Sequence, residues 1–157
     1  MKNLSLLILV FCLTFHTVFA QALEIGAAVP AFGLELLSES SETFTEQDLR
    51  DKVTIIEFWA TWCSPCVASM KELVELKAQF AGDLQVLAVS YEERARIERF
   101  ISNRPLNLTF GYDEEGQLQD YFPHRTVPHT IVIDAAGRVA AVTRPGSISE
   151  ATIERLL

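Results

Sequence analysis

The residues with the clearest capacity for chemistry are Cys63 and Cys66, which enclose a Ser-Pro dipeptide. Two thiols at this spacing could form a structural disulfide, bind a metal ion or act as a redox pair. A structural bridge across so short a loop would stabilise the fold little, because the gain in chain entropy grows with loop length. A zinc finger fits poorly, since 57 residues separate Cys66 from His124, which forms an H-x4-H pair with His129. The spacing therefore favours a redox dithiol.

The cysteine pair lies where a predicted buried strand gives way to a predicted helix. Residues 53–59, VTIIEFW, are rich in β-branched side chains and almost continuously hydrophobic, which is typical of a strand buried on both faces. From about residue 65 to residue 80, apolar side chains recur at three- and four-residue spacing, which predicts a helix. Cys63 is thus expected at the helix N-terminus, where the helix dipole and free backbone N–H groups stabilise the nucleophilic thiolate.

One charged residue, Glu57, interrupts the buried strand six residues before Cys63. Because burial of a carboxylate is costly, we expect desolvation to raise the pKa of Glu57. A carboxyl group with a raised pKa could take the proton from Cys66 when that thiol attacks. The next predicted strand, residues 84–90, offers no lysine partner, which allows Glu57 to rest protonated. Alternatively, Glu57 forms a hydrogen bond with a backbone group or reaches solvent at the strand end.

The rest of the pattern predicts one α/β domain. The strand at residues 84–90 completes a β-α-β unit, whose right-handed crossover makes its two strands parallel. Near the C-terminus, residues 129–134 and 138–142 predict an antiparallel hairpin. Between the strand at residues 84–90 and this hairpin, we expect a short strand at residues 106–110 and a short helix near residues 118–122. We therefore predict a central mixed sheet, with a parallel half and a C-terminal hairpin, flanked by helices.

Residues 1–20 have the features of an export signal. Lys2 supplies one positive charge, residues 6–13 are apolar, and the small residue Ala20 precedes an expected cleavage site before Gln21. One of the three cysteines of the chain lies in this segment. The odd cysteine count is thereby explained, because two cysteines remain in the mature chain.

Removal of this signal leaves one domain, residues 21–157, with a net charge of −9. An uncleaved membrane anchor is the alternative, although a spanning helix needs about 20 predominantly apolar residues. In either case we expect the domain in the periplasm or another extracytoplasmic compartment. The acidic balance, 13 Lys+Arg against 21 Asp+Glu in the full chain, argues against binding to nucleic acid or to anionic lipid. Membrane contact is therefore expected only if the N-terminal segment stays attached.

The run EFWATWCSPC, residues 57–66, resembles the active-site run of the thioredoxin superfamily. Three further segments resemble the exported TlpA/ResA-like branch: VPAFGLEL, TFTEQDLRDK and VPHTIVIDAAGRV. The resemblance covers residues 29–157, nearly the whole mature chain. It implies a thioredoxin-like fold and a thiol-disulfide oxidoreductase that needs no cofactor.

This resemblance implies different roles for the two cysteines. Cys63 would be the exposed attacking cysteine and Cys66 the buried resolving one. The Cys63 thiolate would form a mixed disulfide with a substrate, and Cys66 would then displace the reduced product. Glu57 matches the buried carboxylate of the superfamily. The candidate catalytic residues are therefore Cys63, Cys66 and Glu57.

Further residues around the dithiol are implied to bind or support the substrate. Trp62 would cover the site, and Pro65 belongs to the specific WCxPC run. Pro128 resembles the cis-proline that the family holds opposite the dithiol. A cis bond there would leave the backbone of Val127 to pair with an extended substrate strand. An ordinary trans proline at the start of a strand is the alternative.

The chain departs from the family pattern at three positions. ResA-like members usually have Glu three residues after the second cysteine and often Pro two further on, where this chain has Ser69 and Lys71. Glu57 could take the place of the missing acid. His129 follows the proline, where Thr is common in the family. A histidine beside Cys63 could lower the pKa of that thiol and make the pair more oxidising, or it could face solvent.

The Ser-Pro dipeptide resembles that of reducing members and supplies no cation to stabilise a thiolate. Protein disulfides are the implied substrates. Since a reductant in an oxidising compartment needs an external electron source, a membrane-embedded reductase of the DsbD type is the implied donor. The alternatives are an oxidising, DsbA-like direction and a non-catalytic metal carrier or binding module that uses Cys63, Cys66 and His129. A peroxiredoxin would need a Pro-x-x-x-Thr-x-x-Cys loop, which this sequence lacks.

Overall fold

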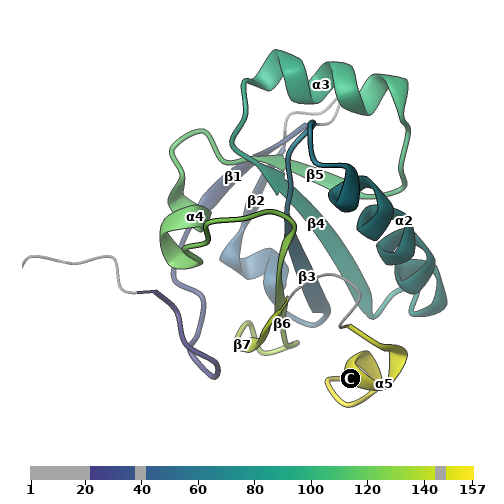
Figure 1. The fold of residues 1–157 in the computed structure, drawn as a ribbon. Coiled ribbons are helices and arrows are strands. Elements are labelled where there is room, and N and C mark those ends of the chain that lie inside the picture. Colours follow the sequence, from purple (N-terminus) through teal and green to yellow (C-terminus); the bar gives the residue numbers. More distant parts are fainter. Residues whose placement is uncertain (1–21, 38–41, 144–147) are drawn as a thin grey trace, which may run out of the picture.

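The computed structural model describes residues 22–37, 42–143 and 148–157, which form one mixed β-sheet with helices on both faces (Figure 1). The predicted export signal, residues 1–20, lies outside the described residues. The strands of the described part follow the order β2-β1-β5-β4-β3-β6-β7. In chain order the elements are β1 (Gly33–Leu36), β2 (Thr43–Thr45), the 3-10 helix η1 (Glu46–Leu49), β3 (Val53–Phe58), α2 (Ser64–Gln79), β4 (Leu84–Ser90), α3 (Arg94–Asn103), β5 (Thr109–Tyr112), α4 (Gln117–Tyr121), β6 (His129–Ile133), β7 (Val139–Thr143) and α5 (Glu150–Glu154).

Strand β3 lies inside the sheet, between β4 and β6, and carries the dithiol loop at its carboxyl end. It pairs in parallel with β4 on one side and antiparallel with β6 on the other. All six of its residues are buried, as their continuous hydrophobicity predicts. The predicted β-α-β unit is confirmed, with α2 as its crossover helix. The start of α2 is thereby held beside the end of the most protected strand.

Side chains of β3 alternate between two separate cores, because successive residues of a strand point to opposite faces. Ile55 belongs to a cluster with side chains from α2 and α5. Ile56 and Phe58 belong to another cluster, which includes side chains from α4 and from the N-terminal strands. Glu57 therefore faces α2, whereas Phe58, the next residue, faces the opposite side of the sheet.

Both ends of the sheet are antiparallel. Strands β6 and β7 form the predicted C-terminal hairpin. A second hairpin, β1–β2, was not predicted, and it joins the sheet through antiparallel pairing of β1 with β5. Strand β5 begins at Thr109, three residues later than the sequence indicated. Strands β1, β2 and β5 are only three or four residues long and depend on pairing with distant segments, so their local hydrophobic pattern is weak.

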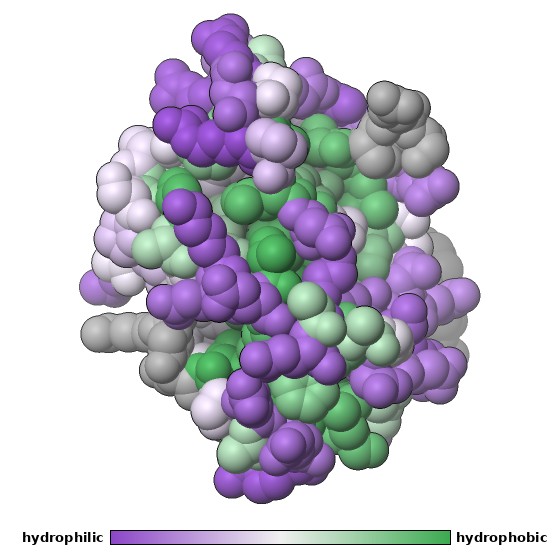
Figure 2. Space-filling model, turned by 90° about the vertical axis from the view of Figure 1, so that its right-hand side faces the viewer, coloured by the Kyte–Doolittle hydropathy of each residue, from purple (hydrophilic) through white to green (hydrophobic). Residues whose placement is uncertain are grey.

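The surface over α2 is mostly hydrophilic, with hydrophobic side chains gathered in the depressions between the helices (Figure 2). Within the described residues, no helix is both long enough and apolar enough to cross a membrane.

Candidate active site

The dithiol lies at the amino end of α2, as predicted. Cys63 is the N-cap residue of this helix, and Cys66 lies in its first turn. The two form a disulfide with a Cα–Cα distance of 5.3 Å. The backbone N–H of Cys66 donates a hydrogen bond to Cys63 Sγ over 3.2 Å. A thiolate at Cys63 would meet the same N–H group and the positive end of the helix dipole, which both favour the charged form.

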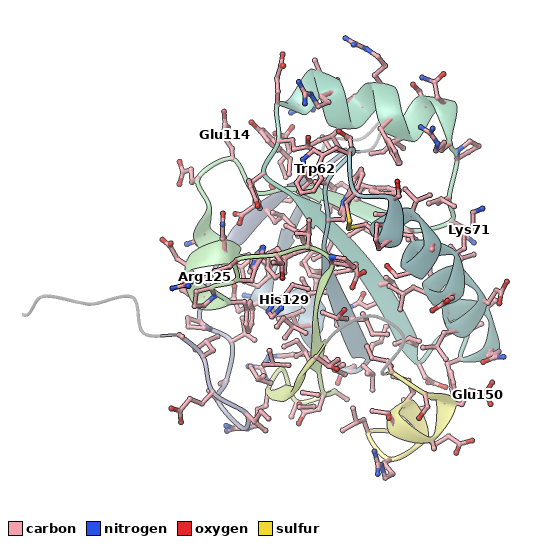
Figure 3. All side chains as sticks on the ribbon, in the orientation of Figure 1. Trp62, Lys71, Glu114, Arg125, His129 and Glu150 are labelled. Atoms are coloured by element: carbon pink, nitrogen blue, oxygen red, sulfur yellow. A yellow bond between two sulfur atoms is a disulfide. The ribbon has the colours of Figure 1, made fainter. Side chains whose placement is uncertain are left out.

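The two cysteine residues differ only slightly in exposure. Cys66 is fully buried, and Cys63 is 3% exposed. Cys63 is thus the more accessible cysteine, but it is less exposed than the resemblance implied. Trp62, the residue before it, is 69% exposed and lies beside the start of α2 (Figure 3). Pro65 is also exposed, in the first turn of that helix.

The loop before β6 lies close to the dithiol. The Val127–Pro128 peptide bond is cis, the form that the resemblance implied. Val127 is partly buried and packs against the hydrophobic cluster that contains both Cys63 and Cys66. The contribution of Val127 and Pro128 to substrate pairing stays a prediction.

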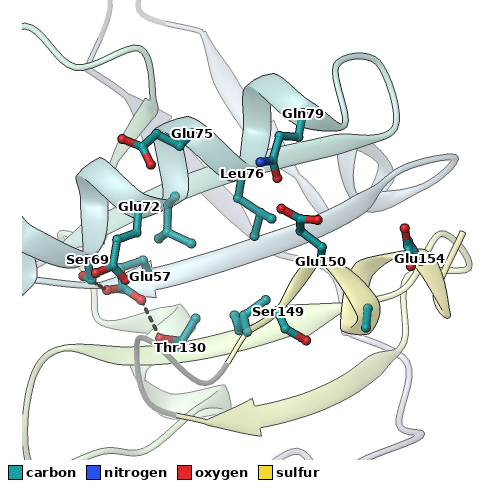
Figure 4. A pocket seen from close by; sticks show the side chains of 13 residues that line it. Glu57, Ser69, Glu72, Glu75, Leu76, Gln79, Thr130, Ser149, Glu150 and Glu154 are labelled. Atoms are coloured by element: carbon teal, nitrogen blue, oxygen red, sulfur yellow. Dashed lines mark hydrogen bonds between the residues drawn. The ribbon is translucent and has the colours of Figure 1, made fainter.

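Glu57 is completely buried and is held by two hydroxyl groups (Figure 4). Ser69 Oγ of α2 donates to Glu57 Oε1 over 2.6 Å, and Thr130 Oγ1 of β6 donates to Glu57 Oε2 over 2.5 Å. Thr130 is the register partner of Glu57 across the β3–β6 pair. Burial raises the pKa of Glu57 from its ordinary 4.5 to about 7, although both hydroxyl bonds act in the opposite direction. The carboxyl group can therefore exchange a proton near neutral pH.

Glu57, Ser69 and Thr130 form what we call the Glu57 cluster. This cluster borders a groove of about 610 Å³ between α2 and α5. Glu57, Ser69 and Thr130 line one end of this groove (Figure 4). Its sides carry four more carboxylates, from Glu72 and Glu75 of α2 and from Glu150 and Glu154 of α5. The groove thus lies against the side chain of Glu57, which is itself fully buried. The groove was not predicted, because α2 and α5 are far apart in the sequence.

His129 lies on the opposite face of the sheet. Its ring stacks on His124 with the centroids 4.9 Å apart and an interplanar angle of 14°. Phe58, the register partner of His129, packs against the ring of His124 at 4.5 Å. Burial lowers the pKa of His129 below its ordinary 6.5, and the neighbouring His124 lowers it further. The ring contacts of His129 are thus made on the α4 side, and its influence on Cys63 stays a prediction.

Glu92 is a residue near the site that the sequence analysis missed. Its carboxylate accepts hydrogen bonds from the backbone N–H of Thr61 and from Thr61 Oγ1, the latter over 3.0 Å. Thr61 lies two residues before Cys63, so Glu92 holds the loop that connects β3 to the dithiol. Its sequence signal is its position just after β4, because the loops at the carboxyl ends of neighbouring parallel strands lie side by side.

Among the described residues, no three His, Cys, Asp or Glu side chains lie close enough together to hold a metal ion.

Comparisons with known proteins identify a family and several relatives of this chain. Residues 25–142 match the AhpC/TSA family. The chain is 30% identical to the thiol-disulfide oxidoreductase ResA of Oceanobacillus iheyensis over 85% of its own length and 69% of that protein. It is 34% identical to the thiol:disulfide interchange protein DsbE of Yersinia pestis, over 72% of this chain and 60% of that one.

A solved structure shows the same fold. The thioredoxin domain of a thiol-disulfide oxidoreductase from Bacteroides vulgatus superposes with a TM-score of 0.73, at 19% identity, over 85% of this chain and 98% of that one. The similarity to ResA and the disulfide at the start of α2 define the class, a thiol-disulfide oxidoreductase, and its fold is thioredoxin-like. Within that class, the chain belongs to the AhpC/TSA family.

Proposed function

We propose that this protein reduces disulfide bonds of protein substrates in an extracytoplasmic compartment. The observation that carries the proposal is the Cys63–Cys66 disulfide at the amino end of α2, beside the exposed side chain of Trp62. The export-signal pattern of residues 1–20 supports the location. The Ser-Pro dipeptide, which supplies no cation to stabilise a thiolate, supports the reducing direction.

The reaction begins with the reduced dithiol. The Cys63 thiolate attacks one sulfur of a substrate disulfide, so the substrate S–S bond breaks and a mixed disulfide forms. The other substrate sulfur leaves as a thiolate and takes a proton from water. Cys66 then attacks Cys63 Sγ and releases the first substrate sulfur as a thiolate. Two electrons have passed to the substrate, and the protein is left with the Cys63–Cys66 disulfide seen in the structure.

Glu57 is the proposed acceptor of the Cys66 proton. Cys66 is completely buried and must lose its proton before it attacks. Glu57 is the carboxyl group of the adjacent strand that faces α2, and its pKa of about 7 suits proton transfer at neutral pH. Ser69 connects the two residues, since its hydroxyl lies within hydrogen-bond distance of both Glu57 Oε1 and the carbonyl of Cys66.

Substrate is proposed to bind around the dithiol. Trp62 and Pro65 are exposed next to Cys63, and the partly buried Val127 and Pro128 approach from the opposite loop. The backbone of Val127 would pair with an extended segment of the substrate. After each turnover, a membrane-embedded reductase of the DsbD type would restore the dithiol. This donor follows from the proposed compartment, where a reductant needs an external source of electrons.

The redox potential of the Cys63–Cys66 couple tests the reducing direction. We expect a value near that of thioredoxin, about −270 mV, when the protein is equilibrated with defined thiol buffers. A value near that of DsbA, about −120 mV, would contradict this proposal. Insulin reduction provides the activity readout: turnover by the wild type and its loss in Cys63→Ser support the enzyme. No turnover, together with stoichiometric binding of zinc or copper, would support a metal carrier instead.

A further inference from the structure

The hydroxyl group of Ser69 lies between two acceptors that belong to different parts of the site. Ser69 Oγ is 2.6 Å from Glu57 Oε1 and 3.0 Å from the backbone carbonyl oxygen of Cys66. Ser69 is buried, with 4% of its surface exposed. A serine hydroxyl has one hydrogen and can accept further hydrogen bonds through its lone pairs. Ser69 can therefore donate to Glu57 or to Cys66 fully, but not to both at once.

The protonation state of Glu57 decides between these two acceptors. An ionised carboxylate can only accept, so Ser69 and Thr130 both donate to it. A protonated carboxyl group has a hydrogen of its own and can donate it to Ser69 Oγ. The Ser69 hydrogen is then free to turn to the carbonyl of Cys66. That carbonyl can accept it in addition to a helical N–H, because a carbonyl oxygen has two lone pairs.

We propose that Ser69 is a positioning residue that couples the protonation of Glu57 to the helical turn that carries Cys66. This inference rests on the proposed role of Glu57 as the acceptor of the Cys66 proton. When Glu57 takes that proton, the Ser69 hydrogen moves from the carboxylate to the Cys66 carbonyl and fixes the turn from which Cys66 has attacked. When Glu57 releases the proton, Ser69 donates to the carboxylate again. The Ser69 oxygen keeps its own hydrogen throughout, so no net charge passes through it.

The surroundings of Glu57 make this coupling specific to Ser69. Thr130 is the other hydroxyl donor to the carboxyl group, but it belongs to β6, and in the described part of the chain its hydroxyl makes no hydrogen bond to α2. The parallel neighbour of Glu57 in β4 is Ala88, which carries no charge. Among the described residues, the titratable groups that line the groove beside Glu57 are the carboxylates Glu72 and Glu75 of α2 and Glu150 and Glu154 of α5. Thr130 therefore provides a matched control for Ser69.

The test is a carbon-13 NMR titration of the full-length oxidised protein from about pH 5 to pH 9, the range that spans the Glu57 transition. The labels are the side-chain carboxyl carbons of Glu and the backbone carbonyl of Cys66, with Glu57→Gln used to assign the Glu57 signal. In the wild type, we expect the chemical shift of the Cys66 carbonyl carbon to change with pH with the same midpoint as that of the Glu57 carboxyl carbon. Ser69→Ala should raise the Glu57 midpoint by about one pH unit, because a donor to the carboxylate is lost, and the Cys66 carbonyl should cease to follow it.

Thr130→Val should also raise the Glu57 midpoint, but the Cys66 carbonyl should still follow it. The inference is overturned if, in Ser69→Ala, the Cys66 carbonyl shift still changes with the Glu57 midpoint and by as much as in the wild type. It is also overturned if Ser69→Ala leaves the Glu57 midpoint unchanged. Failure of the proposed Glu57 role is a separate result: Glu57→Gln would then resolve a mixed disulfide as fast as the wild type, whatever the titration of Ser69→Ala shows.

Discussion

Two adjacent residues of β3 create contrasting environments on the two faces of the sheet. Glu57 faces α2 and is bound by the hydroxyls of Ser69 and Thr130. Phe58 faces the α4 side, where it packs against His124 and lies near His129. The same two strands supply both faces, since Glu57 pairs with Thr130 and Phe58 pairs with His129. Two successive residue pairs of β3 and β6 thus contribute to different clusters. One pair belongs to a carboxyl–hydroxyl cluster on the α2 face, and the next belongs to an aromatic–imidazole cluster on the α4 face.

Burial favours the neutral form on both faces but has different consequences for function. The pKa of Glu57 rises to about 7, which brings its titration into the neutral range. The pKa of His129 falls below 6.5, which moves its titration away from neutral pH. The face that carries Glu57 is therefore equipped to exchange a proton at neutral pH. This is the face against which the dithiol helix packs.

The largest expected effect is the loss of the aromatic side chain on the α4 face. Phe58 is fully buried, so Phe58→Ala should lower the free energy of unfolding by about 3 to 5 kcal/mol. Urea unfolding at about pH 8, where the lowered pKa of His129 leaves its ring neutral, measures this loss. A loss well below about 3 kcal/mol would contradict the full burial of Phe58.

The second prediction concerns the carboxyl group on the α2 face. The folded state raises the pKa of Glu57 from 4.5 to about 7, so the folded protein binds its proton more tightly than the unfolded chain. The contribution of Glu57 to the free energy of unfolding is therefore fully present below pH 4.5 and is lost as the pH rises through about 7. The shift corresponds to about 3 kcal/mol. Glu57→Gln should remove this loss.

Urea unfolding of the wild type and Glu57→Gln, at about pH 4.5 and about pH 8, measures this contribution. The two proteins should differ by about 3 kcal/mol in their change of stability between these pH values. Equal pH dependence in both proteins would mean that Glu57 titrates in the folded state as it does in the unfolded chain.

The smallest effect is expected at His129, and its sign is opposite. The folded state lowers the pKa of His129, so the unfolded chain binds its proton more tightly. Its contribution to stability is present above pH 6.5 and is lost as the pH falls below that value. His129→Gln should reduce the loss of stability on acidification. The effect is smaller than that of Glu57 because His129 is only partly buried. No difference from the wild type at acidic pH would contradict the assigned direction.

The local parts of this arrangement were predictable from sequence. Continuous hydrophobicity identified β3, and the position of Glu57 within it indicated a buried carboxyl group with a raised pKa. The partners of Glu57 were not predictable, because Ser69 and Thr130 are 12 and 73 residues away and meet it only after the sheet and α2 have packed. Glu92 was missed for the same reason, since it lies 31 residues from Thr61.

His129 shows the limit of reasoning from sequence proximity. It follows the proline that the family holds opposite the dithiol, and the sequence left open whether it lies beside Cys63 or faces solvent. Its ring contacts are with His124 and Phe58, because register with β3 pairs it with Phe58 rather than with Glu57. Strand alternation and register decide the face, and both depend on pairing between segments far apart in the chain.

The central claim is that Glu57 accepts the proton of Cys66 during resolution of the mixed disulfide. The most direct test is stopped-flow reaction of the reduced protein with an aromatic disulfide that releases a coloured thiolate. The first release reports attack by Cys63, and the second reports resolution by Cys66. We predict that the second phase accelerates as the pH rises through about 7 and slows about a hundredfold in Glu57→Gln, whereas the first phase is unchanged. A second phase with the same rate and pH midpoint in both proteins would contradict the claim.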